Sequence, residues 1–165
     1  MHKPSLFTGA AAAVAVRAAL PHLVKLKLNR DLAALNRGDY GPLLAGFADD
    51  AVLHFNEGPH RWSGTYEGKA AIERFLKNFV GAGLRGEFGT VWLSGPPWDL
   101  ELAVRFDDEA HAPGGGEQLY ANRTVLWCRT RWGKVVEQRD FYEDTGRIVA
   151  FSDRLDALGV PVATG

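Results

Sequence analysis

The stretch from Lys134 to Asp156, KVVEQRDFYEDTGRIVAFSDRLD, constrains the fold most, because apolar and polar side chains alternate along it. Alternation with a period of two predicts strands. The sequence Asp144-Thr145-Gly146 is typical of a tight hairpin turn, since Gly accepts a positive φ. We therefore predict two strands that share one inward face, made of Val135, Glu137, Arg139, Phe141, Val149, Phe151, Asp153 and Leu155.

Three ionisable side chains, Glu137, Arg139 and Asp153, interrupt this apolar face. A buried ionisable group is costly unless it is paired or hydrogen-bonded. The pattern therefore predicts a polar floor in an apolar pocket, with Asp153 as an acid or base beside an arginine. A structural ion pair of Asp153 with Arg123, Arg139 or Arg154 is the alternative interpretation.

The remaining elements follow from periodicity and turn residues. We expect helices at residues 22–36, 42–48 and 69–80, after an Ala-rich helix that ends or kinks near Pro21. Strand-like patterns cover 51–56, 84–93, 100–106 and 119–131. Strands grouped after helices predict an α+β fold, in which a strongly curved antiparallel sheet wraps about three helices and forms a cone with an internal pocket. The expected organisation is a helical extension (1–21), a single domain (22–160) and a tail (161–165).

Composition narrows the possible partners. A net charge of −1 gives no global electrostatic case for nucleic acid or an anionic membrane. The single cysteine, Cys128, excludes an internal disulfide and suits a reducing, cytoplasmic location. Residues 2–20 resemble a secretory signal in their basic start and apolar run, so a signal or membrane anchor is a minor alternative. The stretch is not long and apolar enough to span a bilayer. We expect no metal site and no cofactor, because neither ligand spacing nor a phosphate-binding glycine loop occurs.

Polar candidates also lie on the first strand, where His54 and Asn56 share a face. His54 is suited to proton transfer near neutral pH, or to an ordinary hydrogen bond. Asn56 can polarise a carbonyl or cap the following turn. A two-residue turn at Trp132-Gly133 would put Leu126 and Cys128 inward, whereas a shift of one residue would put Arg123, Val125 and Trp127 inward.

Three segments in order carry a resemblance to a known family: GDYGPLLAGFADDAVLHFNEGP, GTYEGKAAIERFL and VVEQRDFYEDTGRIVAFSDRLD. They resemble the SnoaL-like branch of the nuclear transport factor 2-like superfamily, which includes ketosteroid isomerase, polyketide cyclases, scytalone dehydratase and limonene epoxide hydrolase. The resemblance covers about Leu28 to Leu158. It implies a curved sheet over three helices, a deep apolar cavity and often a homodimer.

Carried over residue by residue, the resemblance gives a partial site. The general base of ketosteroid isomerase falls near Phe55, which has no basic group. The pocket of limonene epoxide hydrolase matches better: its Asn resembles Asn56, its Tyr falls at His54, its Arg resembles Arg123, and one acid resembles Asp153. The second acid falls at Val125, which cannot ionise.

We therefore expect a cofactor-independent enzyme that acts on a small hydrophobic, oxygenated molecule by isomerisation, cyclisation, dehydration or epoxide opening. Asp153, Arg123, His54 and Asn56 are the predicted catalytic residues. The predicted substrate-binding residues are Glu137, Arg139, Trp127, Phe151 and Tyr66. The alternatives are a non-catalytic ligand-binding module and a module that dimerises through the outer sheet face, predicted to carry Gln138, Asp140, Tyr142, Ser152 and Arg154.

Overall fold

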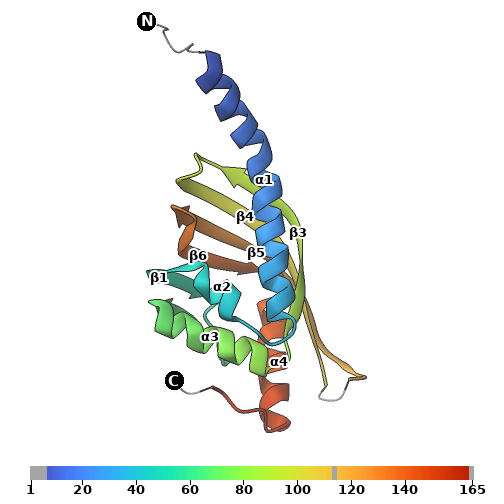
Figure 1. The fold of residues 1–165 in the computed structure, drawn as a ribbon. Helices are drawn as coiled ribbons and strands as arrows, with labels where there is room; N and C mark the ends of the chain where they lie inside the picture. Colours follow the sequence, from blue (N-terminus) through green and yellow to red (C-terminus); the bar gives the residue numbers. More distant parts are fainter. Residues whose placement is uncertain (1–6, 113–114, 164–165) are drawn as a thin grey trace, which may run out of the picture.

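The computed structural model describes residues 7–112 and 115–163 and shows an α+β fold, with helices covering the concave face of a curved sheet (Figure 1). The elements in chain order are α1 (Phe7–Leu35), α2 (Gly41–Ala45), β1 (Phe47–Phe55), β2 (Gly64–Glu67), α3 (Lys69–Gly81), β3 (Arg85–Ser94), β4 (Asp99–His111), β5 (Gln118–Arg131), β6 (Lys134–Tyr142) and α4 (Thr145–Ala157). None of the helices within these described ranges is long and apolar enough to cross a bilayer.

The six strands form one sheet in the order β2-β1-β6-β5-β4-β3. Four of the neighbouring pairs are antiparallel, but β1 and β6 are parallel, so the sheet is mixed and not purely antiparallel as predicted. A parallel pair needs a long crossover connection. The chain supplies one here, because β2, α3 and the β3–β5 meander all lie between β1 and β6.

Helix α3 confirms the prediction made from its apolar spacing. Ile72, Phe75, Leu76 and Phe79 recur at helical intervals, and all four are buried. The helix packs against β1 and β2. Burying each of these side chains contributes about 1.5–3 kcal/mol, so this apolar face holds α3 against the sheet.

Helix α1 is longer than predicted, because it runs without interruption from Phe7 to Leu35 with Pro21 inside it. Proline removes one backbone hydrogen bond, but this loss does not end the helix here. Leu32 and Leu35 in its last turns are buried, as the predicted apolar stripe requires. Figure 1 shows the helix crossing the concave side of the sheet, with its N-terminal half projecting past the sheet.

The predicted strand after Asp144 is wrong, because Thr145–Ala157 forms helix α4. The Asp144 side chain accepts a hydrogen bond from the Arg147 backbone N–H at 3.2 Å, so this residue caps a helix and does not begin a hairpin turn. The buried residues of α4 follow helical spacing: Ile148, Phe151, Ser152 and Leu155. A strand period of two accounts for Phe151 and Leu155 but not for Ile148. A helical period of 3.6 accounts for all three.

The predicted inward face of β6 is also wrong beyond Val135. Arg129 pairs with Glu137, whereas the next residue, Thr130, pairs with Val135, so Val136 is an extra residue in β6. Such a β-bulge reverses the alternation of side chains that follow it. Val135 faces the interior as predicted, but the inward residues are then Gln138, Asp140 and Tyr142, which were predicted to face outward.

The turn between β5 and β6 settles the register of β5. Arg131 pairs with Lys134 around a two-residue turn, in which Trp132 has φ 50° and Gly133 has φ 77°. Cys128 is therefore buried and Leu126 lies against the core. Arg123 and Val125 are exposed, so the alternative with Arg123 inward is excluded.

Candidate functional site

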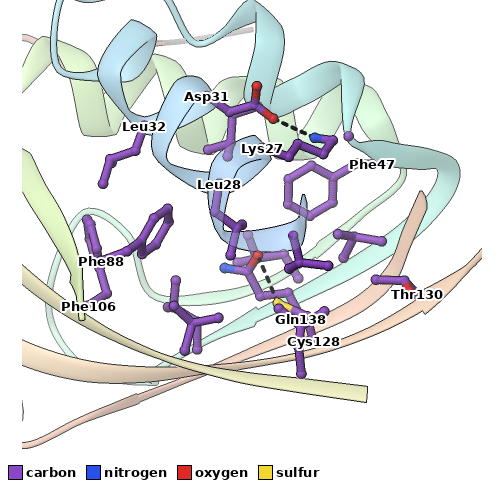
Figure 2. Close-up of a pocket in the computed structure, with 18 of the residues that line it drawn as sticks. Lys27, Leu28, Asp31, Leu32, Phe47, Phe88, Phe106, Cys128, Thr130 and Gln138 are labelled. Carbon is purple, nitrogen blue, oxygen red and sulfur yellow. Dashed lines mark hydrogen bonds and ion pairs between the residues drawn. The ribbon is translucent and has the colours of Figure 1, made fainter. Parts of the chain in front are cut away.

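A cavity of about 270 Å³ lies between α1 and the concave face of the sheet (Figure 2). Its lining is almost entirely apolar and includes Leu20, Val24, Leu28 and Leu32 from α1 and the rings of Phe47, Phe75, Phe79, Phe88 and Phe106. Cavities that bind small molecules are commonly apolar with a few placed polar groups. The polar groups here come mostly from β6 and its neighbour β5.

Asp140 is the carboxylic acid on the β6 wall of this cavity, and its exposed fraction is 8%. Burial raises its pKa from 3.8 to about 7, and the nearby charge of Asp108 acts in the same direction. The Gln138 amide Nε2 donates a hydrogen bond to Asp140 Oδ1 at 2.8 Å and partly offsets the effect of burial. Asp140 can therefore exchange a proton near neutral pH.

Gln138 connects this acid to β5. The Cys128 thiol lies 3.8 Å from Oε1 of Gln138, its directly paired neighbour on β6 (Figure 2). This contact orients the amide so that its Nε2 points to Asp140. Burial raises the pKa of the Cys128 thiol strongly, so the thiol stays protonated and is a weak nucleophile.

A second buried acid, Asp108 on β4, lies behind the cavity. The Tyr142 hydroxyl, whose side chain also lines the cavity, donates a hydrogen bond to Asp108 Oδ2 at 2.9 Å. Asp108 is 3% exposed, and burial raises its pKa to about 7 although the Tyr142 hydrogen bond lowers it. Its Oδ1 has no hydrogen-bond partner among the described residues. Tyr142 thus joins the cavity to a second proton-binding group.

Helix α1 contributes one further acid to the cavity lining, Asp31, which is 1% exposed. Asp31 forms ion pairs with Lys27 (Figure 2) and, at 2.9 Å, with Arg30. Both cations reach solvent, so the carboxylate is neutralised at the edge of the cavity. We assign it a structural role, because its oxygens are already paired.

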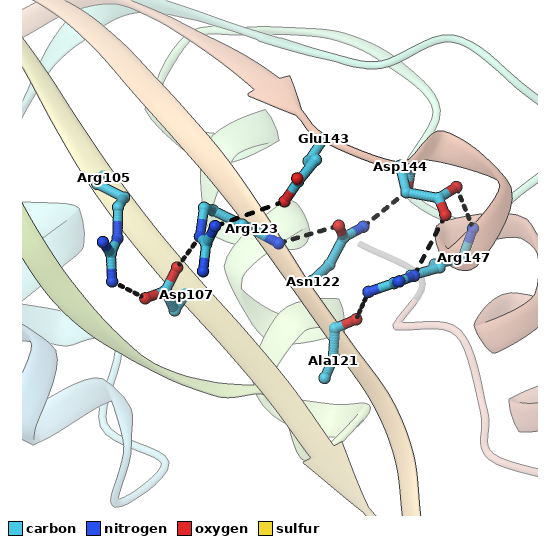
Figure 3. A network of polar contacts seen from close by, with 8 residues as sticks. All are labelled: Arg105, Asp107, Ala121, Asn122, Arg123, Glu143, Asp144 and Arg147. Carbon is cyan, nitrogen blue, oxygen red and sulfur yellow. Dashed lines mark hydrogen bonds and ion pairs between the residues drawn. The ribbon is translucent and has the colours of Figure 1, made fainter.

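A polar groove of about 580 Å³ lies near the end of the sheet where β4 leads into β5. The buried Asp108 is one of the residues that line it. Figure 3 shows a surface network of polar contacts that includes several of the residues lining this groove. Arg123 Nε donates to Asp107 Oδ1 at 2.8 Å, and the Arg123 guanidinium also lies 3.9 Å from Glu143. Arg123, predicted to orient a catalytic acid, is therefore paired outside the cavity.

Asp153 does not lie in the cavity either. It is exposed on α4, because the helix turns it away from the buried stripe. Phe151 is buried between the stacked rings of Trp62 and Tyr120, at centroid distances of 5.6 and 4.6 Å, and it fills the core. Tyr66 packs on Phe75 and donates its hydroxyl to the Trp62 carbonyl oxygen at 2.9 Å. The predicted inward position of Asp153 is therefore wrong, whereas Phe151 faces inward as predicted but packs in the core and does not line the cavity.

The structure does bring four predicted residues together, but on the convex face of the sheet: His54, Trp127, Glu137 and Arg139. Arg139 Nε donates to Glu137 Oε1 at 2.8 Å, and His54 Nε2 lies 3.7 Å from the same carboxylate. Trp127 is the β5 partner of Arg139. Asn56, just after β1, has a buried Oδ1 without a hydrogen-bond partner among the described residues. The predicted pocket-facing positions of Glu137 and Arg139 are wrong because of the bulge.

Sequence reasoning missed the polar residues that do line the cavity, namely Gln138, Asp140 and Tyr142. The available signal was the two-residue turn at Trp132-Gly133, which turns Cys128 inward and so places its β6 partner Gln138 inward. Among the described residues, no group of three or more His, Cys, Asp and Glu is placed to hold a metal ion. The geometry supports binding of a largely apolar guest, with proton transfer or hydrogen bonding to one polar group on it.

The comparisons with known proteins agree on the fold. The profile of the SnoaL-like domain matches residues 29–138. No curated protein sequence shows significant similarity to the chain.

Three solved structures illustrate the likeness of fold. TerC, co-crystallised with polyporic acid, has a TM-score of 0.61 and 22% identity, over 79% of this chain and 95% of that chain. A candidate isomerase from Bacillus subtilis has a TM-score of 0.58 and 19% identity, over 84% and 94%. A protein with a ketosteroid isomerase-like fold from Catenulispora acidiphila, in complex with trimethylamine, has a TM-score of 0.59 and 17% identity, over 84% and 97%.

Proposed function

Because the chain belongs to the SnoaL-like domain family, we propose that it is a cofactor-independent enzyme that moves a proton on a small hydrophobic molecule. Asp140 is the proposed acid and base. The reaction class is isomerisation or a related cyclisation, in which a proton leaves one atom of the substrate and returns to another, or dehydration, in which the proton is passed to a hydroxyl group that leaves as water.

The observation that carries this proposal is the buried Asp140 carboxyl on the wall of an apolar cavity. A catalytic acid or base works best when its pKa lies near the working pH, because both protonation states are then populated. The pKa of about 7 at Asp140 meets that condition. Gln138 donates its hydrogen bond to Oδ1 of Asp140, so Oδ2 is the oxygen proposed to exchange the proton with a guest.

The cavity also limits the substrate class. Its apolar lining favours a hydrocarbon body, and its few polar groups favour one oxygen function near β6. The Tyr142 hydroxyl is committed to Asp108, so Tyr142 would act on a substrate oxygen only together with Asp108. A carbonyl with an acidic C–H next to it fits this arrangement, since the carboxylate can take that proton.

Deuterium exchange tests the proposal without knowledge of the natural substrate. The protein is incubated in D₂O with a panel of cyclic ketones, and loss of the C–H signal next to the carbonyl is followed by NMR. We expect the wild type to accelerate exchange of a panel member, and Asp140→Asn to lower that rate by about 10²–10⁴-fold. Asp153→Asn is the matched control, because Asp153 is exposed on α4 and its substitution should leave the rate unchanged. Equal rates for the two variants would refute the role of Asp140.

A non-catalytic ligand-binding module is the second candidate. It is favoured by Asp31, the other carboxylate in the cavity lining, which is fully engaged with Lys27 and Arg30. A binding module would take up panel members, seen as shifted NMR resonances of cavity methyl groups, without accelerating exchange in any of them.

We also propose that the chain forms a homodimer through the convex face of the sheet. This face carries the exposed apolar side chains of Trp92, Val125 and Phe141, and exposed apolar patches commonly mark interfaces. Phe141→Asp, at a position that is 58% exposed, should convert a dimer to a monomer while the fold is retained. Light scattering of the two proteins would measure the mass, and a monomeric wild type would contradict this assembly.

A further inference from the structure

The cavity opens at the end of the sheet where α1 passes two strand turns. Leu20 and Val24 of α1, Pro97 between β3 and β4, and Gly133 between β5 and β6 all contribute to its lining. Figure 1 shows that the N-terminal half of α1 projects past this same end of the sheet. Because the lining residues Pro97 and Gly133 are themselves exposed, we infer that the entrance lies here, between the projecting helix and the two turns.

Large apolar side chains stand in solvent around this entrance. Trp98 follows the lining residue Pro97 and is 55% exposed. Trp132 precedes the lining residue Gly133 and is 83% exposed. The Trp132 backbone N–H donates to the Trp98 carbonyl oxygen at 3.0 Å, so the two turns are held side by side. On α1, Leu23 is 58% exposed. We call Leu23, Trp98 and Trp132 the entrance rim.

The charge around the entrance rim is positive, although the chain as a whole has a net charge of −1. Lys25, Lys27 and Arg30 of α1 and Arg131 and Lys134 of the β5–β6 turn are exposed. Residues 1–30 contain no Asp or Glu, so every acidic residue of the chain follows them, beginning with Asp31.

Two of the acids close to this region, Asp31 and Asp99, have cationic partners, and a third, Glu101 on β4, is exposed. Asp31 is buried against Lys27 and Arg30, and Asp99 at the start of β4 lies 3.3 Å from Arg129. The basic side chains around the rim are therefore in excess, next to exposed apolar side chains.

We propose that the entrance rim docks on an anionic lipid bilayer surface. Tryptophan is the side chain most suited to the boundary between headgroups and acyl chains, because its ring is apolar and its N–H is polar. Lysine and arginine add attraction to anionic headgroups. No membrane span is needed for this mode, because the rim lies in the interface and the domain stays outside.

Docking in this orientation faces the cavity entrance to the bilayer. An apolar ligand that dissolves in the membrane then passes between the acyl chains and the cavity without crossing water. Only this ligand transfer rests on the proposed function. Docking itself depends on the rim and the surrounding charge, so it is measured independently of catalysis at Asp140.

Co-sedimentation of the full chain with vesicles tests the proposal. Vesicles of phosphatidylcholine with phosphatidylglycerol should bind the wild type, and vesicles of phosphatidylcholine alone should bind it much more weakly. The double variant Trp98→Ser/Trp132→Ser should lower partition into anionic vesicles by about tenfold or more, because two large apolar side chains no longer insert. Arg131→Gln should lower it by about fivefold.

Each further rim variant has a matched control that removes a similar group away from the rim. Leu23→Ser should weaken vesicle binding, whereas Leu158→Ser, at a position that is 52% exposed after α4, should not. Arg37→Gln, beyond the last turn of α1, removes the same charge as Arg131→Gln and should leave binding unchanged. Absence of wild-type binding, or equal binding by the double tryptophan variant, would overturn the proposal. A change of particle mass in that variant with vesicle binding intact would assign the rim to contact between copies of the chain.

Discussion

Replacing Asp140 by Asn should stabilise the fold at pH 8 and leave its stability almost unchanged at pH 4. Burial raises the pKa of Asp140 in the folded protein from 3.8 to about 7. Between these values the folded state holds a proton that the unfolded state has released, so the free energy of unfolding falls as pH rises. Above pH 7 the loss is complete, because the folded protein then carries a buried carboxylate.

The size of the effect follows from the shift. One pKa unit corresponds to about 1.4 kcal/mol, so a rise of about three units makes ionised Asp140 destabilising by about 4 kcal/mol. Asn has the shape of a protonated Asp, cannot ionise, and keeps an oxygen to accept the hydrogen bond from Gln138. Asp140→Asn should therefore raise the free energy of unfolding by about 4 kcal/mol at pH 8, and the melting temperature by roughly 10 °C.

Urea unfolding at pH 4 and pH 8, followed by tryptophan fluorescence, measures this difference directly. Asp153→Asn is again the control, because an exposed carboxylate on α4 should give the same small change at both pH values. The reasoning would be refuted if Asp140→Asn changed stability equally at pH 4 and pH 8. Substitutions at Asp108 and Asp140 should not be additive, since each charge raises the energy of the other.

Two smaller predictions concern single hydrogen bonds. Tyr142→Phe removes the donor to Asp108 Oδ2, so it should raise the pKa of Asp108 above about 7 and lower stability at pH 8 by about 1–3 kcal/mol; an unchanged Asp108 carboxyl titration by ¹³C NMR would contradict this. Asp144→Ala removes the cap of α4 and should cost about 1 kcal/mol in urea unfolding, whereas Asp144→Asn should restore most of it; equal loss in both variants would show that the cap is not the cause.

The fold could be predicted from the sequence wherever one local pattern dominated. The apolar positions of α3 fit only a helix, and β1, β4 and β5 each contain a clear strand pattern. Alternation failed after Asp144 because Val149, Phe151 and Leu155 fit a strand, whereas Ile148, Phe151 and Leu155 fit a helix. Only the capping bond of Asp144 and the packing of Ile148 decide between these two periods.

The candidate site was less predictable, because it depends on which side of one strand faces inward. The expectation of ionisable groups in an apolar hollow is met by Asp140. The residues expected there, Glu137 and Arg139, lie three positions and one position before Asp140 on β6, and both face the other side of the sheet. The resemblance to limonene epoxide hydrolase pointed to Arg123 and Asp153, but both lie outside the cavity. Matching residues in the sequence does not fix the register of β5, which turns Arg123 outward, or the helix α4, which exposes Asp153.

The bulge at Val136 therefore decides which side chains of β6 face the cavity and which face the convex surface. Without the extra residue, alternation from Val135 would carry Glu137 and Arg139 into the cavity and Asp140 to the convex surface. Burying two charged groups there costs several kcal/mol, even when they pair with each other. With the bulge, the same strand buries Gln138, Asp140 and Tyr142, whose polar groups are hydrogen-bonded or protonated. The difference in burial energy selects the bulged register, and this selection places a single titratable acid on the cavity wall of β6.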